Sequence, residues 1–407
     1  MKRFYLPTFI IGLLLLPQQS HAVWSGNVAI QNRYFLNDPL PQNPQQHNNY
    51  LSLSAEPEYY TAWGNDKKSF TFTPFIRIDQ YDNERSHGDI RELSYEQVFS
   101  SWELRVGISK IFWGVTESQH LVDVINQTDN VENIDFEDKL GQPMLKTTFE
   151  QDWGTLDLFV LPYFRERTFQ GIEGRPRSFP VVDTDQVAYE SSRKEQNIDY
   201  ALRWFHYLND IEIGLSYFNG TSREPLFLPG LKNNTPALTL YYPQMQQLGL
   251  DAQLTTDDTL WKLEVIARDW QNIDTTTARL SKETFIALTG GFEYTFVGIA
   301  ESDADIGVVM EYLYDDRGIE ATSFFQNDMM LGFRLAMNDA ASTEALLGVI
   351  YDMDNQERLI SLEASKRLAE SWLATLEIRG FNKIDRLSRL KGIERDDFIQ
   401  LELAYYF

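Results

Sequence analysis

Five side chains that can bind an ion, exchange a proton or hydrogen-bond a polar solute fall within one long segment, residues 113–141. They are Glu117, His120, Asp123, Asn126 and Asp129. A connection of this length without regular structure is uncommon in a compact domain and is usually functional. Two interpretations are open. The segment folds into the molecule and narrows a passage there, or it lies outside and its Asx residues make turns.

The histidines could support a different chemistry, acid–base catalysis. Beyond the first 22 residues they are His47, His87, His120 and His206. A histidine-based hydrolase needs a nucleophile and an orienting carboxylate within reach of the ring. None of the four stands beside a serine–glycine turn, so the sequence predicts no catalytic residue and no enzyme. A hydrolase that uses His87 or His120 with loop carboxylates is the alternative.

Metal binding has little support in the sequence. The chain has no cysteine, which excludes a disulfide scaffold and a thiolate metal site. The carboxylates that end the long segment fit no calcium-loop spacing. We therefore expect neither a metal nor a cofactor, and interpret this run as a solvated acidic stretch: Asp129, Glu132, Asp135, Glu137 and Asp138.

The amino terminus has the pattern of an exported protein. Lys2 and Arg3 precede the apolar run Phe9–Leu16, and small residues at Ser20 and Ala22 follow. This predicts a signal peptide over residues 1–22 and a single domain over 23–407. Removing it leaves 385 of the 407 residues and takes the formal charge from −24 to −26. So negative a chain is not expected to bind nucleic acid.

The rest of the chain alternates apolar and polar residues with a period of two. Eighteen segments, from 24–36 to 396–407, show this pattern and are joined by alternately short and long connections. The seventh is expected to cover 156–165. The pattern predicts an all-β, antiparallel up-and-down barrel with eighteen strands, or sixteen if one weak hairpin is a loop. A secreted β-sandwich or solenoid is the competing fold.

The polar faces of these segments mix Ser, Thr, Gly, Arg and carboxylates, as the wall of a water-filled lumen would. Seven of the nine tryptophans lie near the short turns, where an interfacial aromatic girdle is expected. The nearly balanced charges predict weak selectivity that favours cations. The predicted pore-lining residues are Arg77, Glu92, Glu96, Glu103, Arg105, Asp157, Arg165, Arg203, Lys262, Glu264, Arg334, Glu377 and Arg379.

The final strand carries the clearest resemblance. Its apolar face holds Leu401, Leu403, Tyr405 and Phe407, and the chain stops on an aromatic residue. This ending resembles the terminal strand of Gram-negative outer-membrane β-barrels. In that family the pattern is the signal that the barrel assembly machinery recognises.

A second resemblance lies in the long segment. Trp113-Gly114, followed by Asp123, Asn126 and Asp129, is similar to a stretch in porin-like families of unassigned substrate. Together the two resemblances imply an outer-membrane channel for passive diffusion of small polar solutes. Its expected partners are outer-membrane lipid, the assembly machinery and those solutes. A structural or adhesive barrel with a closed lumen is a further alternative.

Overall fold

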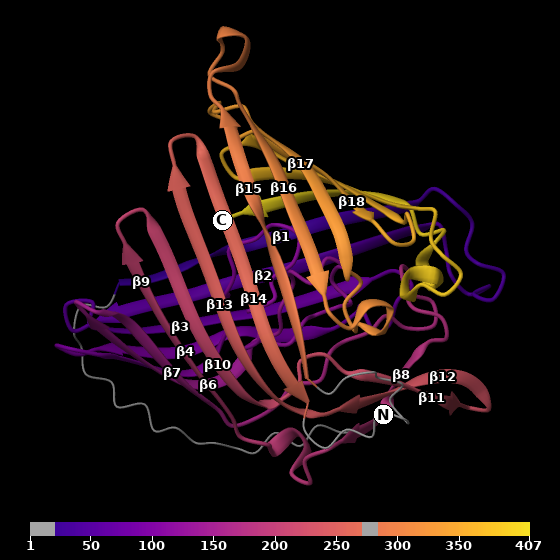
Figure 1. Cartoon of the computed structure of the whole chain (residues 1–407), viewed down its shortest axis with the longest axis horizontal. Helices are drawn as coiled ribbons and strands as arrows, with labels where there is room; N and C mark the ends of the chain where they lie inside the picture. The colour runs from indigo at the N-terminus through magenta and orange to yellow at the C-terminus, as the bar shows by residue number, and fades with distance from the viewer. Residues whose placement is uncertain (1–20, 271–283) are drawn as a thin grey trace.

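A computed structural model describes residues 21–270 and 284–407, so residues 1–20 of the predicted signal peptide lie outside the described residues. Eighteen strands form one closed antiparallel sheet, as the period-two pattern predicts (Figure 1). Their bounds are β1 His21–Phe35, β2 Asn49–Trp63, β3 Lys68–Asp79, β4 Gly88–Val98, β5 Glu103–Ser109, β6 Gln142–Gln151, β7 Gly154–Leu161, β9 Asp199–Leu208, β10 Ile211–Thr221, β13 Gln244–Thr256, β14 Thr259–Trp270, β15 Thr284–Phe296, β16 Asp305–Asp315, β17 Asn327–Ala336, β18 Glu344–Asp352, β19 Arg358–Ala369, β20 Trp372–Asn382 and β21 Phe398–Tyr406.

The barrel closes where its first and last strands meet. Residues Asn27–Phe35 of β1 pair antiparallel with Phe398–Tyr406 of β21, and the Phe407 N–H donates to the Gly26 carbonyl at 3.1 Å. The predicted closure between the two ends of the sheet is therefore confirmed, and no strand of the barrel has an unpaired edge.

The connections differ at the two ends of the barrel. Short hairpins such as those of β9–β10 and β13–β14 lie at the upper left of Figure 1, and the long connections that contain residues 182–189 and 226–242 (labelled β8, β11 and β12) lie at the lower right. Tryptophans meet other aromatic rings near the short turns. Trp24 lies 5.0 Å from Tyr59 and Trp372 lies 5.1 Å from Tyr405, measured between ring centroids.

The two faces of the sheet differ in polarity. Leu53, Ile78 and Leu401 lie on the outer face and are 51%, 60% and 58% exposed. Their strand neighbours Ser52, Arg77 and Gln400 face inward and are buried. An apolar exterior around a polar interior is the arrangement that a barrel needs in lipid.

The long connections contain a second sheet that the sequence analysis missed. β8 (Val182–Tyr189), β11 (Leu226–Lys232) and β12 (Thr235–Tyr242) form three strands at the long-loop end (Figure 1). Prolines such as Pro229 and Pro236 are typical of loops, and they obscure these strands in the sequence. Phe164 packs with Leu240 and Tyr242 of β12 in one buried apolar cluster, and this packing holds the strands in place.

The seventh strand is shorter than predicted. β7 ends at Leu161, so Arg165 does not lie on a barrel strand as expected. The Phe164 N–H instead donates to the Glu195 carbonyl at 2.7 Å, which turns the chain away from the ladder. The remaining regular elements are short 3-10 helices: η1 Lys194–Gln196, η2 Ile299–Glu301, η3 Gly318–Glu320 and η4 Arg389–Ile393. Within residues 21–270 and 284–407, no helix is both long and apolar enough to span a membrane.

Candidate pore constriction

Asn126 fixes the two ends of the long segment together, next to the strands that it joins. Its amide oxygen accepts from the Ile111 N–H at 2.9 Å. Its amide nitrogen donates to the carbonyls of Ser109, at 2.9 Å, and Leu140, at 2.8 Å. One buried side chain thus satisfies backbone groups on both arms, and residues 110–141 form a folded unit rather than a free loop.

This unit packs inside the barrel against an apolar part of the wall. Leu121, Val122, Val124 and Ile125 are buried, and Ile125 has no exposed surface. They lie in one apolar cluster with inward-facing side chains of the strands from β6 to β15: Met144, Phe159, Leu161, Ala201, Phe218, Met245, Ile266, Trp270, Phe285 and Ala287. The unit therefore fills the side of the lumen that these strands enclose.

Glu264 on β14 holds the near part of the unit by its backbone. One carboxylate oxygen accepts from the N–H groups of Val115, at 2.7 Å, and Thr116, at 3.1 Å, and from the Thr116 hydroxyl at 2.8 Å. The other accepts from the Val122 N–H at 3.2 Å. Gly114 permits this approach, because a Cβ there would stand 2.9 Å from the Glu264 carboxylate in a backbone with φ of +147°.

The tip of the unit reaches the far wall. Glu311 on β16 accepts from the N–H groups of Glu117, at 2.8 Å, and Ser118, at 2.9 Å. The Glu117 carboxylate pairs with Arg334 on β17 at 2.6 Å, and Lys262 lies 3.8 Å from it. In the closed strand order β17 stands nine strands from β5, which is half of the eighteen, so the unit crosses the whole lumen.

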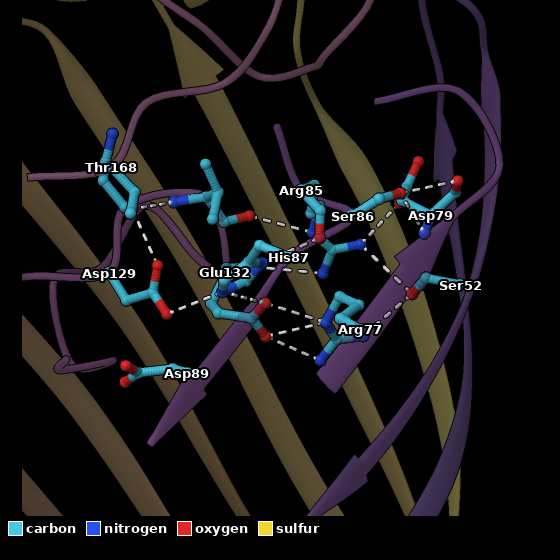
Figure 2. A network of polar contacts seen from close by, with 12 residues as sticks. Ser52, Arg77, Asp79, Arg85, Ser86, His87, Asp89, Asp129, Glu132 and Thr168 are labelled. Atoms are coloured by element: carbon cyan, nitrogen blue, oxygen red, sulfur yellow. Dashed lines mark hydrogen bonds and ion pairs between the residues drawn. The ribbon is translucent and has the colours of Figure 1, made fainter. Parts of the chain in front are cut away.

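The returning arm meets the opposite, polar side of the lumen in the network of Figure 2. Arg77 on β3 makes a two-pronged ion pair with Glu132, with contacts of 2.8 Å from both Nε and Nη2 to Oε2. His87 lies 3.2 Å from Asp129, and Arg91 on β4 pairs with the same carboxylate at 2.9 Å. Two carboxylates of the unit are thus held by three cationic or ionisable groups at the wall.

Arginines also hold the backbone of this arm. Arg85 donates to the Val131 carbonyl at 2.9 Å. It also pairs with Asp79 at 3.0 Å, as Figure 2 shows. Arg33 on β1 donates to the Glu132 carbonyl at 3.3 Å. Farther along, Asp135 pairs with Arg379 on β20 at 3.0 Å. The polar half of the wall thus holds the unit by ion pairs and hydrogen bonds, and the apolar half holds it by packing and by the hydrogen bonds of Glu264.

His87, Asp129 and Glu132 place ligand-type atoms within 4.8 Å of one another, a spacing that could hold a metal ion. However, the guanidinium groups of Arg77 and Arg91 already supply positive charge to both carboxylates at 2.8 and 2.9 Å. A divalent cation would have to displace or repel them. The donor set fits an ion-paired network better than a metal centre.

Both candidate histidines are engaged, and this weakens the case for a catalytic base. His87 contacts the Arg85 carbonyl through Nδ1 at 3.0 Å and Asp129 through Nε2 at 3.2 Å. Burial lowers its pKa, but Asp129 outweighs that effect and the net pKa is raised. His120 lies 3.2 Å from Glu137 and 3.7 Å from Glu264. Burial lowers its pKa too, yet the two carboxylates raise it to about 10, so the ring carries a proton at neutral pH.

Several of the other predicted wall residues form cross-strand pairs. Arg105 meets Glu96 at 2.5 Å, Lys146 meets Asp157 at 3.0 Å, and Arg203 meets Asp251 at 2.7 Å. Such pairs stiffen a sheet. The predicted residues that share the inward parity of a barrel strand are Arg77, Glu92, Glu96, Glu103, Arg105, Asp157, Arg203, Lys262, Glu264, Arg334, Glu377 and Arg379. Arg165, beyond β7, pairs instead with Asp89 at 2.7 Å.

Of the segment residues, Asp123 pairs with Lys139 at 3.0 Å inside the folded unit, and among the described residues it has no ion pair with a wall strand. Glu132, Arg85 and Arg91 were absent from the predicted site, although they hold the unit in place. The run Leu121-Val122-Asp123-Val124-Ile125 carried a usable signal. Four apolar residues in five are unusual for an exposed loop and favour an inward fold.

A polar cavity of about 280 Å³ remains between the returning arm and the wall formed by β1–β4, β20 and β21. Its lining mixes hydroxyl, amide and charged groups, among them Ser54, Glu56, Lys110, Asp138, Thr375, Gln400 and Glu402. Space for a hydrated solute therefore lies on the side of the lumen that the apolar cluster does not fill.

The predicted assembly residues lie at the seam of the barrel. Leu401 and Leu403 pair with Asn32 and Ile30 of β1, and Tyr405 pairs with Val28. Leu401, Tyr405 and Phe407 are exposed on the outer surface. These positions put the apolar face of β21 on the outer surface of the barrel.

The closed sheet, the apolar exterior and the interior crossed by a folded segment define a membrane-spanning β-barrel of porin-like architecture. No protein-family model matches the chain, and no curated protein does. Among solved structures, the chain is similar to OmpT, an outer-membrane protein of Vibrio cholerae, at 10% identity over 97% of this chain and 99% of that one, with a TM-score of 0.45. It is also similar to a variant of the Rh. blastica porin, at 10% identity over 95% and 100%, with a TM-score of 0.44. These distant likenesses assign no function.

Proposed function

We propose that the protein is an outer-membrane channel for the passive diffusion of small polar solutes, constricted by residues 113–141. The observation that carries the proposal is the division of the lumen. One side is filled by the Leu121–Ile125 cluster, and the other keeps a polar cavity lined by Glu56, Thr375 and Glu402. A water-filled passage of this chemistry admits hydrated solutes and excludes apolar ones.

In this proposal residues 1–22 direct export, and the barrel assembly machinery of a Gram-negative cell reads Leu401, Leu403, Tyr405 and Phe407. The exposed apolar belt then contacts outer-membrane lipid. The constricting residues would be Glu117, His120, Asp123, Asn126 and Asp129. In their observed positions Asn126 shapes the unit, and Glu117, His120 and Asp129 connect it to the wall.

A barrel with a closed lumen is the second candidate, because the same contacts that place the unit also hold it firmly. Glu264 and Glu311 each accept several hydrogen bonds from it. A hydrolase has weaker support, since both ring nitrogens of His87 have partners and His120 carries a proton at neutral pH.

Planar-bilayer recording on the purified full chain separates the first two candidates. A channel gives discrete current steps in the wild type, and a closed barrel gives them only after the unit is loosened, for example by Ile125→Asp. If neither protein conducts while both show the heat-dependent gel mobility of a folded barrel, the channel proposal is wrong. Hydrolysis of ester or peptide substrates by the wild type but not by His87→Gln would support the hydrolase hypothesis instead.

A further inference from the structure

An apolar groove of about 640 Å³ crosses the outer surface of the barrel. It follows one row of paired residues over seven neighbouring strands, from β17 through β21 to β1 and β2. The apolar members of that row are Leu335, Ala345, Ala364, Leu376, Leu401 and Leu51. Seven strands are separated by six spacings of about 4.8 Å, so the groove is roughly 29 Å long.

Small side chains create this depression. The outer wall of a closed barrel is convex, so a groove on it has to come from differences in side-chain size. Ala345, Ala364 and Ala374 lie on the outer face among leucines, and each leaves empty the space that a leucine would fill. Leu376 and Leu403 beside them are only partly exposed. The volume is in the range of ligand-binding pockets, about 300–1,000 Å³.

The groove runs obliquely from one end of the barrel to the other. Leu335 and Ala345 adjoin the short 337–343 turn, whereas Leu51 lies just after the long connection 36–48. Because the strands of such barrels tilt by about 35–45°, a row of paired residues climbs along the barrel axis. An extended acyl chain that starts at the short-turn end could therefore follow the groove into the apolar belt.

Two opposite charges line the groove at its short-turn end. Lys366 pairs with Ala374, two residues from Trp372, so it lies on the outer face at the level of the aromatic girdle. It is exposed and has no ion pair among the described residues. Glu344 is exposed too, and its carboxylate accepts from the Ser365 hydroxyl at 3.0 Å. A lysine on the outer face is tolerated at this level, near the membrane interface.

The other charged groups in this region are occupied or face elsewhere. Glu402 also lines the groove, but it accepts from the inward-facing Gln31 amide at 2.9 Å. Asp339, in the turn before β18, is close enough to attract the ammonium group, yet its two oxygens accept from the N–H and the hydroxyl of Thr343, both at 2.8 Å. Arg367 has the inward parity of β19. The end of the groove thus offers one ammonium and one carboxylate, with a second carboxylate beyond them.

We propose that this groove binds one glycerophospholipid with a zwitterionic phosphoethanolamine head. The phosphate meets Lys366, the ammonium group of the head meets Glu344, and one acyl chain lies over Ala364 and Ala374. Both signs of charge at the groove match a head that carries both signs, whereas a purely anionic head would be repelled by Glu344 and Asp339. This binding goes beyond the proposed channel function and does not depend on whether the barrel conducts.

Native mass spectrometry of the purified full-length barrel tests the proposal. The barrel is mixed with equal amounts of phosphatidylethanolamine and phosphatidylglycerol, and the lipid that stays bound after removal of the detergent is counted. We expect one phosphatidylethanolamine per barrel, in severalfold excess over phosphatidylglycerol. Lys366→Gln should weaken retention about fivefold, the effect of one lysine at a membrane surface. Glu344→Gln should bring the two lipids to equal retention, and Ala364→Phe, which fills the groove, should abolish it.

Ala267→Phe and Lys67→Gln are the matched controls. Ala267 is exposed on the outer face of β14, Lys67 lies in the exposed short turn between β2 and β3, and neither lines the groove. Both variants should retain lipid like the wild type, and heat-dependent gel mobility would show that every variant is folded.

Three outcomes would contradict the proposal. The groove binds no lipid if the folded wild type retains none, or if Ala364→Phe and Ala267→Phe retain equal amounts. Equal retention of the two lipids by the wild type would overturn the assignment of the head. A dimer of the barrel that is lost in Ala364→Phe but not in Ala267→Phe would show that a second copy of the chain covers the groove instead.

Discussion

The carboxylate of Glu264 and the hydroxyl of Thr116 lie 2.8 Å apart, although 148 residues separate them in the sequence. Glu264 belongs to the wall and Thr116 to the segment that crosses the lumen. The same carboxylate also accepts hydrogen bonds from three backbone N–H groups, so it fixes the path of the chain as well as the Thr116 side chain.

Replacing Glu264 by Gln should therefore loosen the segment. The amide keeps the size of the side chain but loses the charge and half of the acceptor capacity, at a cost of about 3 kcal/mol in a buried position. We expect a lower thermal midpoint and a larger single-channel conductance. Glu370→Gln, in the exposed turn between β19 and β20, is the control and should leave both unchanged. If Glu264 does not hold the segment in the lumen, the two variants will have the same thermal midpoint and the same conductance.

Ile125→Ala tests the apolar side of the same attachment. Ile125 is fully buried, so the substitution should cost the packed segment about 2–5 kcal/mol. Conductance should rise and become noisier as the segment leaves the wall. Ile360→Ala removes a side chain of the same size from the outer face of β19, where it is 38% exposed, and should not alter the current. An unchanged current in Ile125→Ala would mean that packing does not control the passage.

Deleting residues 118–138 should enlarge the passage and relax size exclusion, but it also uncovers inward side chains such as Phe159, Phe218 and Phe285. We therefore expect a second effect, a lower yield of folded barrel, because these rings would face water. Liposome-swelling rates with sugars of increasing size measure the first effect. Unaltered size exclusion in the deleted protein would place the segment outside the permeation path.

Alkaline pH should weaken the attachment at His120. Because Glu137 and Glu264 raise its pKa to about 10, the protonated ring stabilises the docked segment fully below the ordinary histidine pKa. That contribution declines above the ordinary pKa and is lost as the pH rises through about 10. Wild-type conductance should grow over this range, and His120→Gln should show a flatter profile. If conductance depends on pH in the same way in both proteins, groups other than His120 cause the pH response.

Removing Phe407 should reduce the amount of folded barrel in the membrane. The residue donates its N–H to the Gly26 carbonyl and exposes its ring beside the seam. Phe407→Tyr keeps both the aromatic ring and the backbone contact and should assemble normally. The amount of heat-modifiable barrel in membrane fractions measures this. If the deletion variant gives as much folded barrel as the wild type, the Phe407 ring is not needed for assembly.

The sequence predicted the strands better than the interior. Period-two alternation is a local property, so all eighteen barrel strands could be recognised from it. The Leu121–Ile125 cluster depends on which inward side chains of distant strands meet it, and no local pattern contains that information. The same holds for Glu132, whose partner Arg77 lies 55 residues away. The three strands β8, β11 and β12 could not be predicted, because packing around Phe164 and Tyr242, rather than period-two alternation, determines them.

The hydrogen bond from Gln31 to Glu402, 2.9 Å long, joins residues that are 371 positions apart. Most other neighbouring strands of the barrel follow one another directly in the sequence, so two such strands can pair soon after the second one is synthesised. The pairing of β1 with β21 must wait until the final strand has emerged. During that interval β1 and the growing end both present free backbone groups, which are prone to pair with other chains. The timing of this last step, rather than its entropic cost, which grows only slowly with chain length, sets how long these backbone groups stay unpaired.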